Sequence, residues 1–261
     1  MVEHYRNLWN FVRVVHDKDE DGASICNSST CPRMSASTYV FIFVLNNILP
    51  NKTYSNHSFT WLNAHKQPVE VPAHEYISLM QRWISGKIDN TNIFPTDPAG
   101  VSFAHNTGGP NISSSNYASG GLDTPGANTP IPVGPTTLTT SLSQLAGAGD
   151  WIGKSSGFPP DFFEVCQTIF RQMFRVYAHL YWAHFIEPFY HLNLEKSMNS
   201  CFSHFVLTAM EIDMLKPSEL EPMQPLIDLW AANGTLPKTS KAYASANIKA
   251  GDRLLALAGA N

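Results

Sequence analysis

The sequence predicts a mainly helical bundle with a small β-hairpin and a structural zinc site. Three observations lead there: long segments with apolar residues at three- and four-residue spacing, two short strand-like runs in the first third, and paired cysteines and histidines. We expect a single domain over residues 1–232, interrupted by a low-complexity insert over 97–156 and followed by a C-terminal tail over 233–261.

The composition supports a packed core and excludes several classes of protein. Hydrophobic residues make up 43% and aromatic residues 11% of the 261 positions. The formal net charge of -4 argues against wholesale nucleic-acid binding. The sequence contains no run of about 18 apolar residues, so no membrane span is predicted. Met1–Arg13 is too polar for a signal peptide. Four cysteines do not make a disulfide scaffold in a chain this long, so we expect a reducing cytoplasmic or nuclear location.

The first third of the chain contains two predicted helices and short strands. Apolar periodicity predicts an amphipathic helix over 3–16 and another over about 73–86. The β-branched and aromatic run Val40–Leu49 reads as a strand followed by a loop. Thr60–Asn63 and Val69–Val71 are expected to form the two short strands of a hairpin.

A long polar insert separates this part from the remaining helices. Residues 98–149 contain one charged residue, Asp123, and are dominated by Gly, Pro, Ser, Thr and Asn. Such a segment cannot bury enough apolar surface to offset the entropy of ordering it. We therefore expect a disordered loop inserted within one domain.

The later helices follow from the longest periodic pattern in the chain. A helix is predicted over 159–185 with a wide apolar face, and a second over about 197–214. Ser218 and Glu221 have the spacing of a capping box and predict a last helix reaching Trp230. The tail that follows is expected to be weakly helical at best.

Two cysteines and two histidines have the spacing of a metal site. Cys26 and Cys31 form C-x4-C, and His179 and His184 form H-x4-H. Two thiolates and two imidazoles suit tetrahedral zinc. Four protein ligands leave no position for an activated water, so the metal would be structural. It would join an early loop to a distant helix and contribute about 10 kcal/mol or more to folding.

The spacing of the histidines leaves an alternative open. Residues five apart on an ideal helix lie about 140° apart around its axis. His179 and His184 therefore reach one metal only if their side chains lean together or the helix is distorted there. Otherwise they are two core histidines, and the two cysteines are unrelated to them.

Several blocks of the chain together resemble the Mob family of kinase co-activators (Mob/phocein). The resemblance covers residues 1–96 and 157–232. It runs through Cys31-Pro32-x-Met34-Ser35-Ala36, Trp61, Pro72-Ala73-x-x-Tyr76-Ile77, Phe94-Pro95, Phe174-Arg175-Val176-Tyr177-Ala178-His179-x-Tyr181-x-x-His184-Phe185, Asn199-x-x-Phe202-x-His204-Phe205 and Leu220-Glu221-Pro222-Met223.

The resemblance implies a fold, a metal site and a class of partner. Family members are helical bundles with a small hairpin, and their four zinc ligands fall on Cys26, Cys31, His179 and His184. They have no catalytic activity. They bind the N-terminal regulatory segment of NDR/LATS-type kinases and help to activate them in cell-cycle and morphogenesis signalling. The phocein branch instead joins striatin–phosphatase assemblies.

The resemblance also implies a phosphopeptide site on the long helix. The basic positions that read phosphorylated peptides in the family correspond to Arg171, Gln172 and Arg175. Arg171 and Arg175 are four residues apart, so they share a helix face and can grip one phosphate. Gln172 departs from the basic residue of the family. The alternative is a solvated basic stripe, or arginines paired with nearby glutamates.

Two further departures concern the first sixty residues. The additional N-terminal helices that carry the acidic kinase-facing surface of family members are expected to be missing. The stretch Val40–Ser58 has no family counterpart, and its deletion would join Thr38-Tyr39 to Phe59-Thr60-Trp61. We hypothesise that this stretch is translated intron and that the short start is a related gene-model error.

Other function classes find less support in the sequence. A zinc-dependent hydrolase would need an open metal position, and no G-x-S-x-G, P-loop or G-x-G-x-x-G pattern is present. Cys166 and Cys201 lie on apolar helical faces, which favours core positions over nucleophiles. A nucleic-acid zinc finger would need a different ligand spacing.

Overall fold

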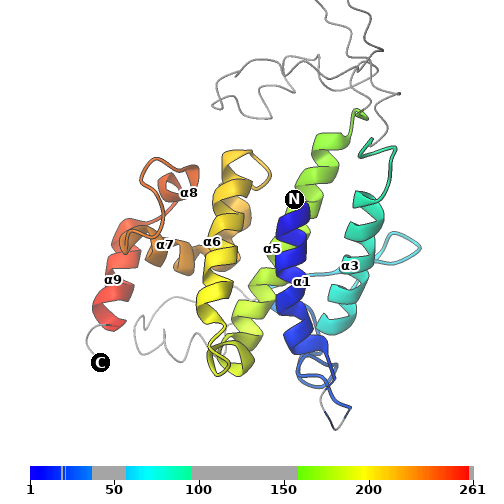
Figure 1. Cartoon of the computed structure of the whole chain (residues 1–261), viewed down its shortest axis with the longest axis horizontal. Helices are drawn as coiled ribbons and strands as arrows, with labels where there is room; N and C mark the ends of the chain where they lie inside the picture. The colour runs from blue at the N-terminus through cyan, green and yellow to red at the C-terminus, as the bar shows by residue number, and fades with distance from the viewer. Residues whose placement is uncertain (19, 21, 37–56, 96–157, 259–261) are drawn as a thin grey trace, which may run out of the picture.

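One long helix forms the centre of the molecule. The computed structural model describes residues 1–18, 20, 22–36, 57–95 and 158–258. The central helix α5 (Phe162–His184) contacts α1 (Val2–His16) and α3 (Ala73–Ile88). Figure 1 shows α6 (Glu195–Glu211) on the other side of α5 from α3. These four helices confirm the predicted helical segments to within about three residues at each end.

The packing of α5 follows from its wide apolar face. From Val176 to Trp182 every side chain of α5 is buried. Tyr177 stacks obliquely on Phe202 and Phe205 of α6, at ring-centroid distances of 4.9 and 5.3 Å. Burial of such aromatic rings contributes most of the apolar area that stabilises a core. The predicted apolar face is therefore confirmed as the centre of the core.

Two small antiparallel strand pairs lie between α1 and α3 in the chain. The strand β1 (Ser35–Ala36) pairs with β2 (His57–Ser58). The strand β3 (Trp61–Leu62) pairs with β4 (Pro68–Val69), which confirms the predicted hairpin. β2 uses the last two residues of the stretch Val40–Ser58. The predicted strand Val40–Leu49 and the low-complexity insert lie outside the described residues.

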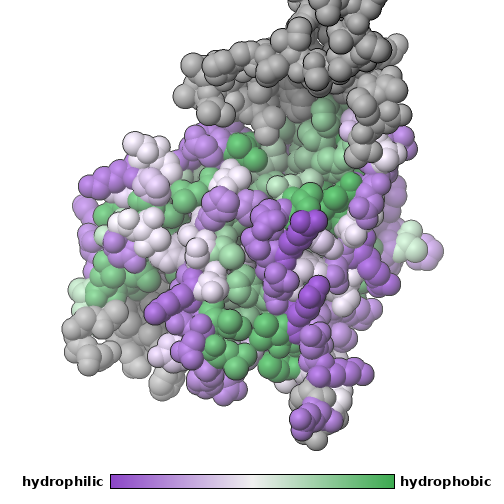
Figure 2. All heavy atoms as spheres, in the orientation of Figure 1, coloured by the Kyte–Doolittle hydropathy of each residue, from purple (hydrophilic) through white to green (hydrophobic). Residues whose placement is uncertain are grey.

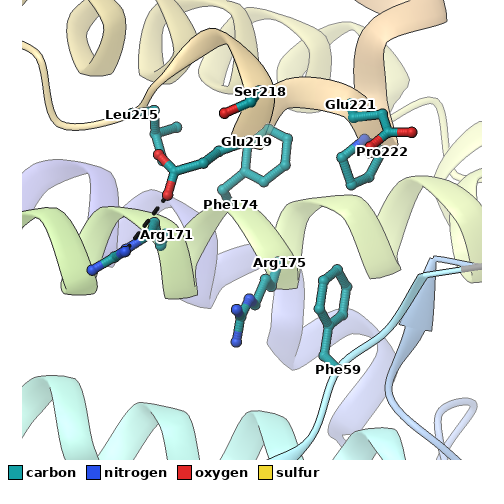
Figure 3. A pocket seen from close by; sticks show the side chains of 9 residues that line it. All are labelled: Phe59, Arg171, Phe174, Arg175, Leu215, Ser218, Glu219, Glu221 and Pro222. Atoms are coloured by element: carbon teal, nitrogen blue, oxygen red, sulfur yellow. Dashed lines mark ion pairs between the residues drawn. The ribbon is translucent and has the colours of Figure 1, made fainter.

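The predicted last helix is divided in two. A 3-10 helix, η3 (Pro217–Met223), precedes α7 (Gln224–Ala232). The predicted capping box of Ser218 and Glu221 is wrong, because the carboxylate of Glu219 accepts the backbone N–H of Lys216 at 2.7 Å. Figure 3 shows η3 above α5. The Trp182 indole of α5 donates to the Pro222 carbonyl of η3 at 2.9 Å.

The segment after Gly234 is helical, contrary to the expectation of weak helicity. It contains α8 (Lys241–Ala244) and α9 (Ile248–Ala258), and α9 packs closely against α7. Its Gly251 lies so near α7 that an added Cβ would meet the Asp228 carbonyl oxygen. The apolar periodicity of the sequence underestimated the helix content of this segment, because short helices depend on tertiary packing for their stability. The division of the chain after residue 232 remains a prediction.

On the face drawn in Figure 2, polar side chains alternate with apolar areas, and one of these lies at the end of α5. Figure 2 shows hydrophobic side chains gathered low in the view, where α5 meets the π-helix η2 (Phe185–Tyr190) and α6 begins. Ile186, Tyr190 and Leu192 are exposed there. Within the described parts of the chain, no helix is both long enough and apolar enough to span a membrane.

Candidate metal centre and phosphate pocket

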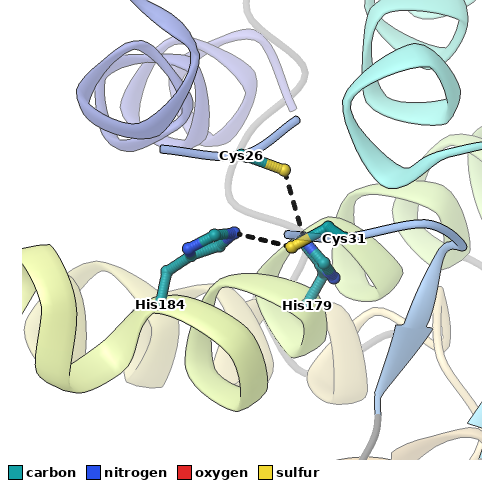
Figure 4. A group of neighbouring side chains, drawn as sticks. All are labelled: Cys26, Cys31, His179 and His184. Atoms are coloured by element: carbon teal, nitrogen blue, oxygen red, sulfur yellow. Dashed lines mark hydrogen bonds between the residues drawn. The ribbon is translucent and has the colours of Figure 1, made fainter. Parts of the chain in front are cut away.

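The two cysteines and two histidines singled out in the sequence meet at one buried point. Their four ligand atoms all lie within 4.8 Å of one another, and all four residues are buried. The Cys26 sulfur lies 3.6 Å from Nε2 of His179, and the Cys31 sulfur lies 3.6 Å from Nε2 of His184. Figure 4 shows the sulfurs, carried by the early loop, facing the imidazoles of α5. The structure therefore brings together residues more than 150 positions apart.

The loop between the cysteines is organised by Asn27. Its side-chain oxygen accepts the backbone N–H groups of Ser29 and Thr30, at 2.8 and 3.0 Å. The N–H of Cys26 donates to the Val15 carbonyl near the end of α1, at 2.8 Å. These bonds make a compact turn that aims both thiols inward.

The end of α5 at His184 explains how two histidines five residues apart can face the same point. His184 is the last residue of α5, and its φ of -131° and ψ of 4° depart from helical geometry. The π-helix η2 begins at the next residue. This distortion brings the two imidazole centroids to 5.1 Å, which an undistorted helix would not do. Of the two arrangements that the sequence left open for a shared metal, the distorted helix is the one present at His184.

The dimensions of the cluster fit a tetrahedral metal. Zinc bonds of about 2.3 Å to sulfur and about 2.0–2.1 Å to nitrogen give a sulfur-to-nitrogen edge of about 3.6 Å in a tetrahedron. The two thiol–imidazole distances have this value. The neighbouring Cys26 thiol and both imidazoles hold the pKa of Cys31 well below its ordinary value, while the same contact raises the pKa of Cys26. A thiolate ligand is thus favoured in this cluster.

Arg171 and Arg175 line a second feature, a pocket of ≈ 220 Å³ between α5 and η3. Its other walls include Phe59, Phe174, Glu219 and Glu221 (Figure 3). Nη1 of Arg171 lies 3.6 Å from Oε1 of Glu219. Two of the three residues inferred for phosphopeptide binding therefore share one pocket, and acidic residues share it with them.

Gln172, the third residue inferred for this site, does not line the pocket. Its side-chain oxygen accepts the Tyr76 hydroxyl at 3.0 Å and Nη1 of Arg175 at 3.3 Å. The same Arg175 nitrogen donates to the Tyr76 hydroxyl at 3.1 Å, and its guanidinium lies 5.0 Å from the centroid of the Phe59 ring. Gln172 thus orients Arg175 instead of adding charge. Sequence reasoning missed Tyr76 and Glu219, because only the fold brings them to α5.

Comparison with protein families identifies the chain. The model of the Mob1/phocein family matches residues 21–108 and 150–223, which is well over half of the sequence and includes all four metal-site residues. The chain belongs to the Mob1/phocein family. The matched regions end at Met223, the last residue of η3, so α7, α8 and α9 lie beyond them.

Curated Mob proteins from fungi and plants are similar to this one. The CBK1 kinase activator protein MOB2 of Candida albicans is 27% identical over 186 residues, which are 71% of this chain and 41% of that protein. The maintenance of ploidy protein mob2 of Schizosaccharomyces pombe is 26% identical over 82% of this chain and 57% of its own length. The MOB kinase activator-like 1A of Medicago sativa subsp. falcata is 26% identical over 78% and 61%. The chain thus spans about half the length of these relatives.

Proposed function

We propose that this Mob protein is a non-catalytic adaptor that binds the N-terminal regulatory segment of an NDR/LATS-type protein kinase and promotes its activation. The observation that carries the proposal is the buried Cys26, Cys31, His179 and His184 cluster within a Mob1/phocein chain. Relatives named as kinase activators support the same role.

The cluster is proposed to hold a structural zinc ion. Its donor set and its sulfur-to-nitrogen distances suit zinc. With four protein ligands the coordination sphere is closed, so no position is left for the bound water of a hydrolase. The residues of the cluster then serve to fix the early loop on α5. This favours the adaptor over the zinc-hydrolase reading.

The pocket between α5 and η3 is proposed to receive a phosphorylated peptide. Arg171 and Arg175 provide charge-assisted donors on one helix face, and Phe59 and Phe174 provide apolar walls. Gln172 supports this reading through its bond to Arg175, although it carries no charge itself. A cytoplasmic or nuclear location remains part of the proposal, and imaging of the tagged protein in cells tests it.

The adaptor proposal is tested with the purified full chain. We expect about one zinc per chain by elemental analysis, capture of an isolated NDR/LATS-type N-terminal segment, and increased kinase activity on mixing. A Cys201→Ser variant is the matched control, because Cys201 is half-buried on α6 and does not belong to the cluster. Metal-dependent hydrolysis of ester or peptide substrates, without kinase capture, would contradict the proposal.

A further inference from the structure

We propose that Glu219 is an internal competitor in the phosphate pocket, so that a ligand must displace its carboxylate from Arg171 in order to bind. The inference rests on the proposed phosphate-binding role of that pocket and adds a determinant of its selectivity. It makes the pocket respond to phosphorylated segments and reject segments that are merely acidic.

The two carboxylate oxygens of Glu219 have separate partners. Oε2 accepts the backbone N–H of Lys216 at 2.7 Å, which fixes the side chain at the start of η3. Oε1 lies 3.6 Å from Nη1 of Arg171. The other terminal nitrogen of Arg171 donates to Oγ1 of Thr168 at 2.8 Å. The ion pair therefore joins two side chains that are each held in place by a second contact.

The two arginines of the pocket differ in whether a carboxylate is paired with their positive charge. Arg171 is paired with the Glu219 carboxylate. Within the described residues, Arg175 contacts three neutral groups: the Phe59 ring, the Tyr76 hydroxyl and the Gln172 amide oxygen. A ligand anion thus meets one arginine oriented by neutral groups and one arginine that already has a counterion. Full use of both arginines requires that Glu219 be replaced.

Displacement of the Glu219 carboxylate is more favourable for a phosphate ligand than for a carboxylate ligand. A carboxylate that replaces Glu219 forms an equivalent ion pair and loses translational freedom, whereas Glu219 is already attached to the chain. A phosphate monoester carries about −1.5 to −2 charges and three acceptor oxygens. It can bridge Arg171 and Arg175, which Glu219 does not do in this structure. An element that disfavours the wrong ligand gives specificity at some cost in affinity.

The substitution Glu219→Gln isolates this effect. A glutamine oxygen can still accept the Lys216 N–H, so the start of η3 is retained while the charge is removed. Glu164→Gln is the matched control, because Glu164 is an exposed carboxylate of α5 that does not line the pocket. Equal thermal unfolding midpoints of the wild type and both variants establish that each is folded.

Inorganic phosphate and acetate are the probes, titrated separately into the full chain and followed by NMR at constant ionic strength. We expect phosphate binding by wild type and acetate binding too weak to detect. In Glu219→Gln, phosphate should bind about two- to fivefold more tightly, as expected for loss of a partly exposed ion pair, and acetate binding should become measurable. Glu164→Gln should behave as wild type. A phosphothreonine peptide library should likewise bind wild type in preference to the same library with glutamate, and Glu219→Gln should reduce that preference.

The outcomes separate the competitor from the phosphate site itself. Unchanged phosphate affinity and no acetate binding in Glu219→Gln would overturn the competitor role and leave the phosphate pocket intact. Absence of phosphate binding in every variant would overturn the phosphate pocket, and the competitor role with it. An equal gain in Glu164→Gln would show a general effect of net charge and would also overturn the competitor role.

Discussion

The early loop and the C-terminal helices are fixed to the bundle by different kinds of interaction. The loop meets α5 through Cys26 and Cys31, whose sulfurs lie against the imidazoles of that helix. The C-terminal helix α9 lies against α7, with Gly251 at the point of closest approach. The first junction depends on ligand chemistry and falls inside the family match, whereas the second depends on packing and lies outside it.

The difference reflects how much apolar surface each segment can bury. Residues 22–30 are mostly small and polar, and within the described residues their only buried apolar side chain is that of Cys26. A loop of this kind gains little from the hydrophobic effect, and the four bonds of the proposed metal ion would supply the missing stability. The helix α9 instead has Leu254 buried and Gly251 pressed against α7. Each junction should therefore respond to a different perturbation.

Removal of the metal should have the largest effect and should act on the early loop first. Cys31→Ser replaces a thiolate ligand, and loss of the metal removes about 10 kcal/mol of folding free energy. We expect loss of bound zinc and a large fall in the thermal midpoint, measured by elemental analysis and circular dichroism. Cys201→Ser should retain the metal. Full stability of Cys31→Ser without metal would contradict the metal junction.

Acid should destabilise α1 through His4, which lies 5.5 Å from Phe205 by ring centroids. Burial lowers the pKa of His4 from 6.5 to about 4, so below pH 6.5 the unfolded chain binds a proton that the folded chain does not. The stability that neutral His4 provides is complete above pH 6.5 and is lost as the pH falls towards 4, by up to about 3 kcal/mol.

The variant His4→Phe isolates this contribution. It keeps an aromatic ring against Phe205 and removes the titrating group. Urea unfolding between pH 4 and 7, with zinc present throughout, should give a shallower loss of stability than in wild type. Because the metal ligands are common to both proteins, equal slopes would show that His4 does not titrate as described.

The sequence predicts the contact of the early loop with α5 better than the contact of α9 with α7. The four residues of the cluster could be singled out because their pairs suit a metal site and the family resemblance covers them, although their spacing alone left two core histidines as an alternative. Their geometry could not be predicted, because the helix distortion at His184 depends on the chain that follows it. The packing of α9 could not be found, because a glycine in a short helix is ordinarily a weak point and Asp228 is distant in sequence.

The residues of the pocket could likewise be predicted only in part. Arg171 and Arg175 share a helix face, and helical periodicity reveals this. The partners Tyr76 and Glu219 come from other elements, and no local pattern connects them to α5. The family resemblance therefore identified the residues that carry charge, and local spacing placed them on one helix face. The residues that orient or neutralise that charge depend on tertiary structure.

A methyl group at Gly251 should weaken the C-terminal junction without affecting the metal. The new Cβ would lie 2.7 Å from the Ala232 Cβ and would also meet the Asp228 carbonyl oxygen. Overpacking of this kind costs about 1–3 kcal/mol. Hydrogen exchange should become faster in α9 and α7 of Gly251→Ala, with α5 protected as before. Gly86→Ala is the control: its Cβ would meet nothing within 4 Å, so it should stabilise α3 by about 0.5–1 kcal/mol.

The smallest effect is expected from the ion pair that joins α8 to the end of α6. Nζ of Lys241 lies 2.7 Å from the Asp213 carboxylate and also donates to the Glu211 carbonyl at 3.0 Å. Both charged side chains are substantially exposed, so Lys241→Met should cost at most about 1 kcal/mol. Urea unfolding at low salt and in 1 M NaCl measures this cost, which should shrink at high salt through screening. A loss as large as that of Gly251→Ala would mean that charge, and not close packing, holds the C-terminal helices.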